Sequence, residues 1–206
     1  MEIILASGNK DKFRQLAIYF EQAGHVLVMP EKIIEIEENE ATLQANAEKK
    51  ALTYSAEYPG RYVLATDGGV KIVYLGDDWN HILTHRLSGR DKGQKMSERE
   101  RCEMLLTMMK DAHGDDRLIS WHEAYAVTKD GQILFSKEFF DEENDISVLL
   151  ESIPPDFQET GFWLGYLWYE KKFGKHYMAL TNEEKKSLDG RLSKLVRELE
   201  EKRVFV

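Results

Sequence analysis

The chain has 206 residues, a formal net charge of −9 at pH 7, 42% hydrophobic residues and 32% charged residues. This length supports one substantial core or two small lobes, and the composition is typical of a soluble globular protein. The acidic balance argues against a surface that coats nucleic acid. No apolar run is long enough to span a membrane, and no signal-peptide core follows the first residues. We therefore expect a single domain over residues 1–206 that binds neither nucleic acid nor membranes.

The single cysteine, Cys102, excludes an intramolecular disulfide and favours a reducing, cytoplasmic location. It falls at an apolar position of a predicted helix, so we expect it in the core and not as a nucleophile. The spacing of cysteine and histidine fits no structural or catalytic zinc site.

The start of the chain predicts a phosphate site. An apolar run at residues 3–6 indicates a strand, a polar Ser-Gly-Asn turn follows at 7–9, and the apolar spacing of residues 13–23 indicates a helix. This order directs free backbone N–H groups and the positive end of the helix toward one point, which suits an anion. Lys12 adds positive charge. The same pattern also occurs in α/β proteins for packing alone.

Helices and strands alternate in the first two thirds of the chain. The pattern predicts helices over 13–23 (closed by Gly24), 42–58 (with Thr42 as N-cap) and 97–109 (with a capping box of Ser97 and Glu100), and strands over 26–29, 62–65 and 70–75. We interpret Asp67, Gly68 and Gly69, between the last two strands, as a sharp turn.

The last third has a different pattern. It predicts a hairpin over 118–127 and 133–140, an aromatic strand over 162–169, and a helix over 181–202 that opens with a capping box and contains Gly190. The whole sequence thus predicts an α/β fold with a mixed sheet flanked by helices. The central antiparallel section is a candidate for a second lobe.

Two acidic positions are candidates for catalysis. Glu38 lies in an acidic loop before the helix that carries Asn46 and Lys50, and Asp67 directly follows a predicted strand. A carboxylate at the end of a strand points into the crevice where α/β sheets bind ligands. Two carboxylates with lysines nearby suit metal-assisted phosphoryl chemistry, because carboxylate oxygens hold Mg²⁺ and lysines bind phosphate oxygens. Singly, each is better explained by a solvated acidic run, an ordinary turn or a surface lysine.

The aromatic segment 162–169 has two interpretations. Trp163, Tyr166 and Trp168 could form core, as aromatic strands usually do, or a platform on which a base stacks. Lys185 and Arg191 follow in or near the last predicted helix.

Two motifs near the start have a specific spacing. Residues 7–12 match T/S-G-N-x-x-K, and residues 38–51 match E-x-x-x-T-x-x-x-N-A-x-x-K-A, through Ser7, Gly8, Asn9, Lys12, Glu38, Thr42, Asn46, Ala47, Lys50 and Ala51. In this order they resemble the inosine triphosphate pyrophosphatase family, whose members hydrolyse aberrant purine nucleoside triphosphates to monophosphate and pyrophosphate.

Later blocks of that family match in part. Its A-D-D-S-G-L keeps the second Asp here as Asp67, but Thr66 replaces the first. Its L-T-x-E-E-K is matched at residues 180–185, whereas Gly190 stands at the His of the following S-H-R. Its F-G-Y-D-P appears at residues 164–168 with Leu and Trp in place of Asp and Pro. The resemblance is therefore to a divergent member.

The resemblance implies a two-lobed α/β fold with a mixed sheet and an active cleft between the lobes, a Mg²⁺-dependent hydrolysis and a homodimer. By position, Glu38 and Asp67 are the expected metal ligands, and Asp67 also orients or deprotonates the attacking water. The expected contacts to the nucleoside triphosphate are Ser7, Asn9, Lys12 and Lys50 for the phosphates, and Lys185 and Arg191 for the base end.

The departures concentrate where the family reads the base. Leu167, Trp168 and Gly190 stand where the family has polar residues or proline. A site built on hydrogen bonds discriminates between bases by factors on the order of 10⁴, and it loses this discrimination without its polar groups. We therefore predict a pyrophosphatase with altered or relaxed base specificity. Thr66 also removes one carboxylate from the cluster that is expected around the metal. Two alternatives stay open: a non-catalytic nucleotide-binding or regulatory protein on the same fold, and a scaffold or assembly protein with a vestigial cleft.

Overall fold

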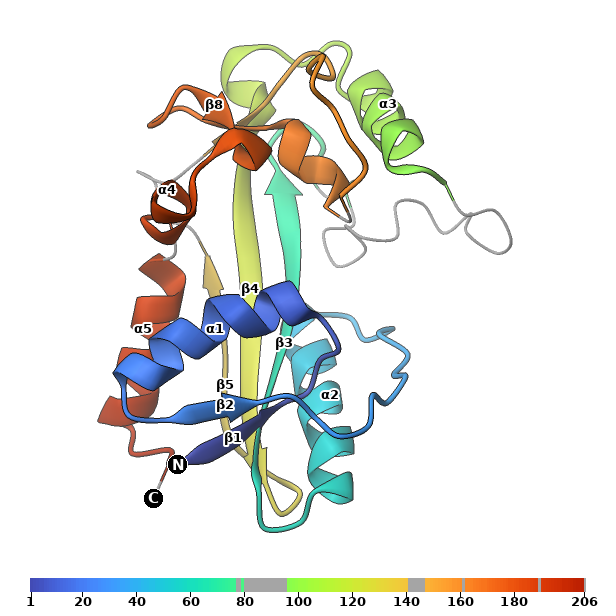
Figure 1. The fold of residues 1–206 in the computed structure, drawn as a ribbon. Coiled ribbons are helices and arrows are strands. Elements are labelled where there is room, and N and C mark those ends of the chain that lie inside the picture. The colour runs from blue at the N-terminus through green and yellow to red at the C-terminus, as the bar shows by residue number, and fades with distance from the viewer. Residues whose placement is uncertain (77–78, 80–95, 141–146, 161, 189, 206) are drawn as a thin grey trace. The chain divides into compact units, whose positions relative to one another are not determined.

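The computed structural model describes residues 1–76, 79, 96–140, 147–160, 162–188 and 190–205 (Figure 1). Eight strands pair in the order β2-β1-β3-β4-β6-β7-β8, with β5 on β4. The chain divides into two units. The first unit comprises Met1–Gly68, His122–Phe140 and Gly190–Val206, and the second comprises Gly69–Trp121 and Asp141–Asp189.

The first unit contains a mixed sheet and three helices. Its strands are β1 (Glu2–Leu5), β2 (Val26–Val28), β5 (Gln132–Phe140) and the adjoining parts of β3 (Tyr62–Ile72) and β4 (Leu118–Lys129). Its helices are α1 (Lys10–Gln22), α2 (Leu43–Glu57) and α5 (Gly190–Glu201). β1 is parallel to β2 and β3, and β4 and β5 form an antiparallel hairpin. The predicted α/β class and the mixed sheet are thus confirmed.

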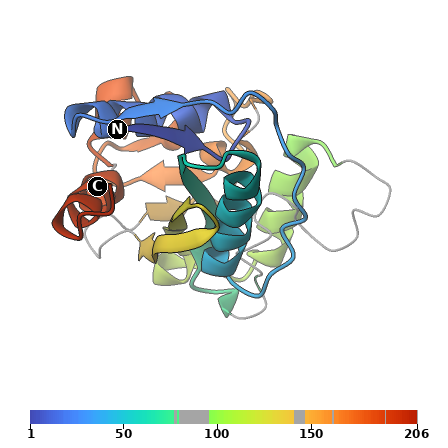
Figure 2. The same ribbon diagram turned by 90° about the horizontal axis from the view of Figure 1, so that it is seen from below.

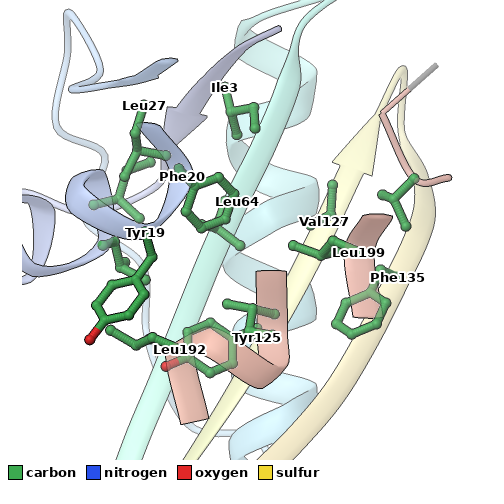
Figure 3. Close-up of a cluster of buried hydrophobic side chains, with 14 of the residues drawn as sticks. Ile3, Tyr19, Phe20, Leu27, Leu64, Tyr125, Val127, Phe135, Leu192 and Leu199 are labelled. Atoms are coloured by element: carbon green, nitrogen blue, oxygen red, sulfur yellow. The ribbon is translucent and has the colours of Figure 1, made fainter. Parts of the chain in front are cut away.

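Strand alternation divides the first unit into two layers of side chains. Leu64, Tyr125 and Val127 point to one face, where they pack with residues of α1 and α5 such as Phe20 and Leu199 (Figure 3). Successive side chains of a strand point to opposite faces, so one face of the sheet is apolar where these helices cover it. This face forms the core of the first unit.

Helix α2 lies on the other side of the hairpin. Figures 1 and 2 show α2 and α5 on opposite sides of β4 and β5. Thr128 Oγ1 donates to the Ala51 carbonyl at 3.0 Å, and Ser136 Oγ donates to Glu48 at 2.6 Å. The N-cap Thr42 accepts a bond from the backbone of Ala45, as the sequence predicts. These contacts fix α2 against the sheet.

The second unit has short elements. Besides the remaining parts of β3 and β4, it contains β6 (Ser147–Leu149), β7 (Trp168–Glu170), β8 (Lys175–His176), α3 (Glu98–Met108), α4 (Asn182–Lys186) and 3₁₀ helices over Gly114–Arg117, Trp163–Tyr166 and Tyr177–Ala179. The capping boxes Ser97–Glu100 and Thr181–Glu184 are both present. β6, β7 and β8 pair antiparallel in sequence order.

A separate apolar core forms in the second unit. Cys102 is fully buried there beside Leu105 and Trp163, and its Sγ donates to the Trp163 carbonyl at 3.2 Å. Burial raises the pKa of the Cys102 thiol to about 12, which makes it a poor nucleophile. The predicted core role of Cys102 is therefore confirmed.

Strand β3 corrects one prediction. It runs without a break from Tyr62 to Ile72, so Asp67, Gly68 and Gly69 lie inside a strand and not in a turn. Neither glycine adopts a positive φ. Gly favours turns because it tolerates such angles, but nothing forces it to use them. β3 lies between β1 and β4 in the sheet, β1 pairs with it at residues 62–64, and the two glycines continue the strand beyond that pairing.

Three further predictions are corrected. The hairpin belongs mainly to the first unit, so it is not the second lobe. The aromatic segment is a 3₁₀ helix, Trp163–Tyr166, followed by the short strand β7. The last predicted helix is two helices, with Gly190 at the start of α5 and not inside it. No helix in the described residues is long and apolar enough to cross a membrane.

Candidate active site

The turn between β1 and α1 is held by its own side chains. Ser7 Oγ accepts a hydrogen bond from the Asn9 N–H at 3.1 Å, and Asn9 Oδ1 accepts one from the Lys12 N–H at 3.0 Å. Asn9 therefore caps α1, a position that favours Asn. A Cβ on Gly8 would lie 3.3 Å from Ile33 Cδ1, so glycine suits this close approach. Two N–H groups that the sequence assigned to an anion are thus bonded within the turn.

The end of β1 brings Thr66 and Asp67 next to this turn. Leu5 is the last residue of β1 and pairs with Leu64, and the Ala6 N–H donates to the Leu64 carbonyl at 2.8 Å. Thr66 and Asp67 follow on β3, beyond the carboxyl end of its parallel neighbour. Ligands of α/β proteins bind at such ends. Asp67 therefore has the predicted location, although its own strand continues.

Asp67 is the centre of a cluster with Glu38 and α2. Lys50 Nζ lies 3.0 Å from Glu38 Oε1 and 3.2 Å from Asp67 Oδ1. Asn46 Nδ2 donates to Asp67 Oδ2 at 2.9 Å, and Asn46 Oδ1 accepts the Glu40 N–H at 3.0 Å. Asn46 and Lys50 are one helical turn apart, so both reach the same carboxylate. The structure thus brings together residues of three segments that the sequence singled out.

Burial controls the ionisation of Asp67. Only 7% of the residue is exposed. The removal of water raises the pKa of the Asp67 carboxyl, and the neighbouring charge of Glu38 raises it further. Lys50 and Asn46 oppose this shift without cancelling it. A carboxylate with a raised pKa accepts a proton more readily than an ordinary aspartate, which suits a general base.

A second cluster contains a residue that the sequence analysis missed. Lys12 Nζ donates to Thr66 Oγ1 at 2.7 Å and lies 3.2 Å from Glu123 Oε1. Thr66 Oγ1 donates to the same Glu123 oxygen at 2.8 Å, and Tyr125 OH donates to Glu123 Oε2 at 2.8 Å. Glu123 lies on β4, on the face that carries Tyr125. The only signal in the sequence was a carboxylate on the otherwise apolar strand face that carries Trp121, Tyr125 and Val127.

Glu123 is held in its carboxylate form near neutral pH. Its burial alone would raise the pKa, but the charges of Lys12 and Arg191 and the bonds from Thr66 and Tyr125 outweigh burial and lower the pKa to about 2. Arg191, expected at the base end of a nucleotide, is therefore electrostatically coupled to this cluster. A buried carboxylate with several donors is stable only as the anion.

The remaining candidate residues lie in the second unit. Lys185 Nζ is 5.0 Å from the centroid of the Tyr177 ring. Trp163 and Trp168 are buried in the second core, and the Trp168 Nε1–H donates to Glu170 at 2.7 Å. Buried rings present no face for stacking, so these two tryptophans have the core role that was one of the two interpretations.

The first-unit cluster fits Mg²⁺ by its donor chemistry. No three His, Cys, Asp or Glu side chains gather as a ready metal centre within the described residues. Glu38 and Asp67 nevertheless converge on one cation, the Lys50 ammonium. Mg²⁺ prefers oxygen ligands and usually takes one or two carboxylates together with phosphates and water. Two converging carboxylates meet that requirement.

The fold and these clusters define a mixed α/β protein with lysines and carboxylates gathered at the carboxyl end of its first strand. The chain belongs to the Ham1 family, whose sequence model matches residues 3–201. This confirms the resemblance to the inosine triphosphate pyrophosphatases over nearly the full chain.

Two relatives illustrate the extent of the similarity. The chain is 26% identical over 203 residues to a dITP/XTP pyrophosphatase of Desulforamulus reducens, covering 97% of this chain and 94% of that protein. It is 42% identical over 78 residues to a dITP/XTP pyrophosphatase of Nautilia profundicola. The second match covers 37% of this chain and only 40% of the relative's length.

Solved structures show the same fold. A HAM1 protein from Coxiella burnetii superposes with a TM-score of 0.76 at 21% identity, covering 98% of this chain and 99% of that one. The Ham1 protein of Staphylococcus aureus gives a TM-score of 0.71 at 22% identity, covering 97% and 98%. The predicted fold class is thus supported by full-length structural similarity.

Proposed function

We propose that this protein hydrolyses a nucleoside triphosphate to the monophosphate and pyrophosphate with the help of Mg²⁺. The observation that carries the proposal is the convergence of Glu38, Asn46, Lys50 and Asp67 in one cluster of a Ham1-family chain. Relatives named dITP/XTP pyrophosphatases support the same reaction class.

In the proposed reaction, a water oxygen attacks the α-phosphorus and the bond from that phosphorus to the pyrophosphate oxygen breaks. Asp67 accepts the proton of the water, and its raised pKa favours this transfer. Asn46 and Lys50 hold the carboxylate in place through one bond to each oxygen. Fixing the base before reaction lowers the entropic part of the barrier.

Lysine side chains bind the phosphates in this proposal. Lys12 and Lys50 supply positive charge from α1 and α2. Ser7 and Asn9 contribute polar groups at the turn between β1 and α1. Fixed positive charges stabilise the negative charge that moves onto the leaving pyrophosphate. An overall charge of −9 makes such local lysines necessary for an anionic substrate.

Glu38 and Asp67 would hold the Mg²⁺ ion. When bound, the ion polarises phosphate oxygens and lowers the pKa of a coordinated water. Lys50 contacts both carboxylates in this structure and would direct its remaining ammonium donor to a phosphate oxygen.

For the base end, we propose altered or relaxed specificity. Leu167 and Trp168 occupy positions where the resembled family carries Asp and Pro, and Gly190 stands at its His. The Trp168 indole N–H is already bonded to Glu170. Lys185 and Arg191 remain the polar candidates for contact with the nucleotide. Without dedicated hydrogen-bond partners, discrimination between bases falls.

A panel of nucleoside triphosphates, including dITP, XTP, ATP, GTP, CTP and UTP, assayed with Mg²⁺ for pyrophosphate release tests the function. We expect turnover of several members, and at least a hundredfold loss of kcat in Asp67→Asn. Asp111→Asn, at an exposed aspartate, is the matched control and should keep parental activity. The proposal fails if no nucleotide is turned over, or if Asp67→Asn behaves like the parent.

One observation favours a second function, a non-catalytic nucleotide binder. The Lys50 ammonium already contacts both carboxylates that would hold the metal. Calorimetric titration separates the two functions, because tight binding of a triphosphate without pyrophosphate release identifies a binder. A homodimer, a cytoplasmic location and a single-domain organisation stay predictions from the sequence.

A further inference from the structure

We propose that Glu123 is a positioning residue that holds the Lys12 ammonium toward a phosphate, and that Thr66 and Glu123 form a reciprocal pair in which β4 supplies the carboxylate that β3 lacks. The role toward phosphate rests on the proposed function. The pairing of positions 66 and 123 does not depend on that function.

Lys12 is held by two partners inside the protein. Its Nζ lies 2.7 Å from Thr66 Oγ1 and 3.2 Å from Glu123 Oε1, so two of the three ammonium donors are directed into the protein. The Lys12 side chain is 26% exposed, whereas that of Glu123 is 10% exposed. The partly exposed Lys12 ammonium is thus held by a buried carboxylate. The third donor of the ammonium is available for a ligand oxygen.

Glu123 is itself held at both of its carboxylate oxygens. Thr66 Oγ1 donates to one of its oxygens and Tyr125 OH to the other, each at 2.8 Å. A carboxylate bonded on both oxygens has little rotational freedom. Glu123 therefore fixes the position of the Lys12 ammonium more firmly than a solvent-exposed carboxylate would.

At position 66, the resembled family carries an aspartate. Thr66 Oγ1 lies within hydrogen-bond distance of both Lys12 Nζ and Glu123 Oε1. An aspartate there would place its oxygens against those of Glu123, and two negative charges at that separation repel each other. One carboxylate is therefore accommodated beside Lys12, from position 66 or from position 123, but not from both.

A double-mutant cycle on the full-length protein tests the pairing without any substrate. The variants are Thr66→Asp, Glu123→Gln and Thr66→Asp/Glu123→Gln, followed by urea unfolding at pH 7. We expect each single variant to lower the unfolding midpoint and the double variant to regain most of the loss, because one carboxylate again faces Lys12. Thr66→Asn, which has the shape of Asp without its charge, should be less harmful than Thr66→Asp. Additive losses in the double variant would overturn the pairing.

Steady-state kinetics test the positioning role. In Glu123→Gln we expect kcat per folded molecule to fall at least tenfold without a rise in KM, because a negative charge is removed while Lys12 loses its orientation. The double variant should recover most of kcat. A Glu123→Gln variant that loses stability but keeps kcat would show a merely structural role and overturn the inference. If the parent has no turnover, the proposed function fails, and the unfolding cycle still decides the pairing.

Discussion

Adjacent residues 66 and 67 of β3 serve two different clusters. Thr66 contacts Lys12 of α1 and Glu123 of β4, whereas Asp67 contacts Asn46 and Lys50 of α2. This follows from the alternation of side chains along a strand, which directs neighbours to opposite faces. Both residues lie beyond the carboxyl end of β1, and β2 ends there as well.

The pKa of Asp67 makes the proposed reaction sensitive to pH. The carboxylate form is the base, and burial raises its pKa, so activity should fall as pH decreases through that raised value. Asn46→Ala removes a hydrogen bond that lowers the pKa, and we expect the acidic limb of kcat/KM to move to higher pH. An unchanged limb in Asn46→Ala would indicate that another group controls it.

Glu123 should make the folded state sensitive to acid. Its pKa is lowered from 4.5 to about 2, so its stabilisation is present above pH 4.5 and is lost as pH falls toward 2. The shift corresponds to a contribution of order 3 kcal/mol. Urea unfolding of the parent at pH 6 and pH 3 should show this loss, and Glu123→Gln should show a smaller loss over the same interval. Equal losses in both proteins would contradict the assignment.

At the scale of elements, Arg117 ties α3 to β6. It is 5% exposed, and its guanidinium donates to the carbonyls of Met109, Ala112, Leu149 and Leu150 at 2.5–3.3 Å. Carbonyls near the end of a helix lack partners within the helix, so a cation is favourable there. Burial lowers the pKa of Arg117, yet arginine stays charged in proteins.

Replacing Arg117 should destabilise the second unit. Arg117→Met keeps the apolar stem but leaves buried carbonyls without a donor, and we expect a loss of about 3 kcal/mol in the free energy of unfolding. Arg197→Met, at an exposed position of α5, is the control for loss of charge and should change stability by less than about 0.5 kcal/mol. Denaturant unfolding followed by circular dichroism provides the measurement, and equal effects would rule out this role of Arg117.

The sequence predicted elements whose signals are local. Thr42, the two capping boxes and the hairpin turn after Lys129 appear as expected, because short-range hydrogen bonds and turn residues determine them. The unbroken β3 was mispredicted because glycines in a sequence indicate a turn, whereas Gly68 and Gly69 lie inside a strand here. Pairing between segments that are far apart in the chain has no signal in the local sequence.

The candidate site shows the same division. Spacing predicted that Asn46 and Lys50 share one side of a helix, and the family resemblance added Glu38 and Asp67, which the structure places beside them. Glu123 could not be predicted in this way. Its link to Lys12 depends on the order of β3 and β4 in the sheet, and its strand pattern reads as core.

At the scale of the whole molecule, each unit is built from separate stretches of chain. The first unit needs the C-terminal helix α5, whose Leu192, Leu195 and Leu199 complete a core begun by β1 and α1. The second unit has its own core around Leu105 and Trp163. The chain passes between the units at four points, so folding of the first unit depends on contacts between residues far apart in sequence.

Loss of one buried leucine in α5 should therefore be costly. Leu195 is fully buried, and we expect Leu195→Ala to lower the free energy of unfolding by about 2–5 kcal/mol. Leu105→Ala, in the core of the second unit, is the matched substitution. Hydrogen exchange of the two variants shows whether the effect of each spreads beyond its own unit. A loss below about 1 kcal/mol for Leu195→Ala would contradict the packing described.

The distribution of tryptophan gives the molecule a built-in optical label. All four tryptophans, Trp79, Trp121, Trp163 and Trp168, belong to the second unit, whereas the lysine and carboxylate clusters belong to the first. Intrinsic indole emission therefore reports on one half of the chain only. A change in that emission on addition of a nucleotide would show that the ligand affects the second unit, which lacks the lysine and carboxylate clusters. No dye or engineered probe is needed to observe it.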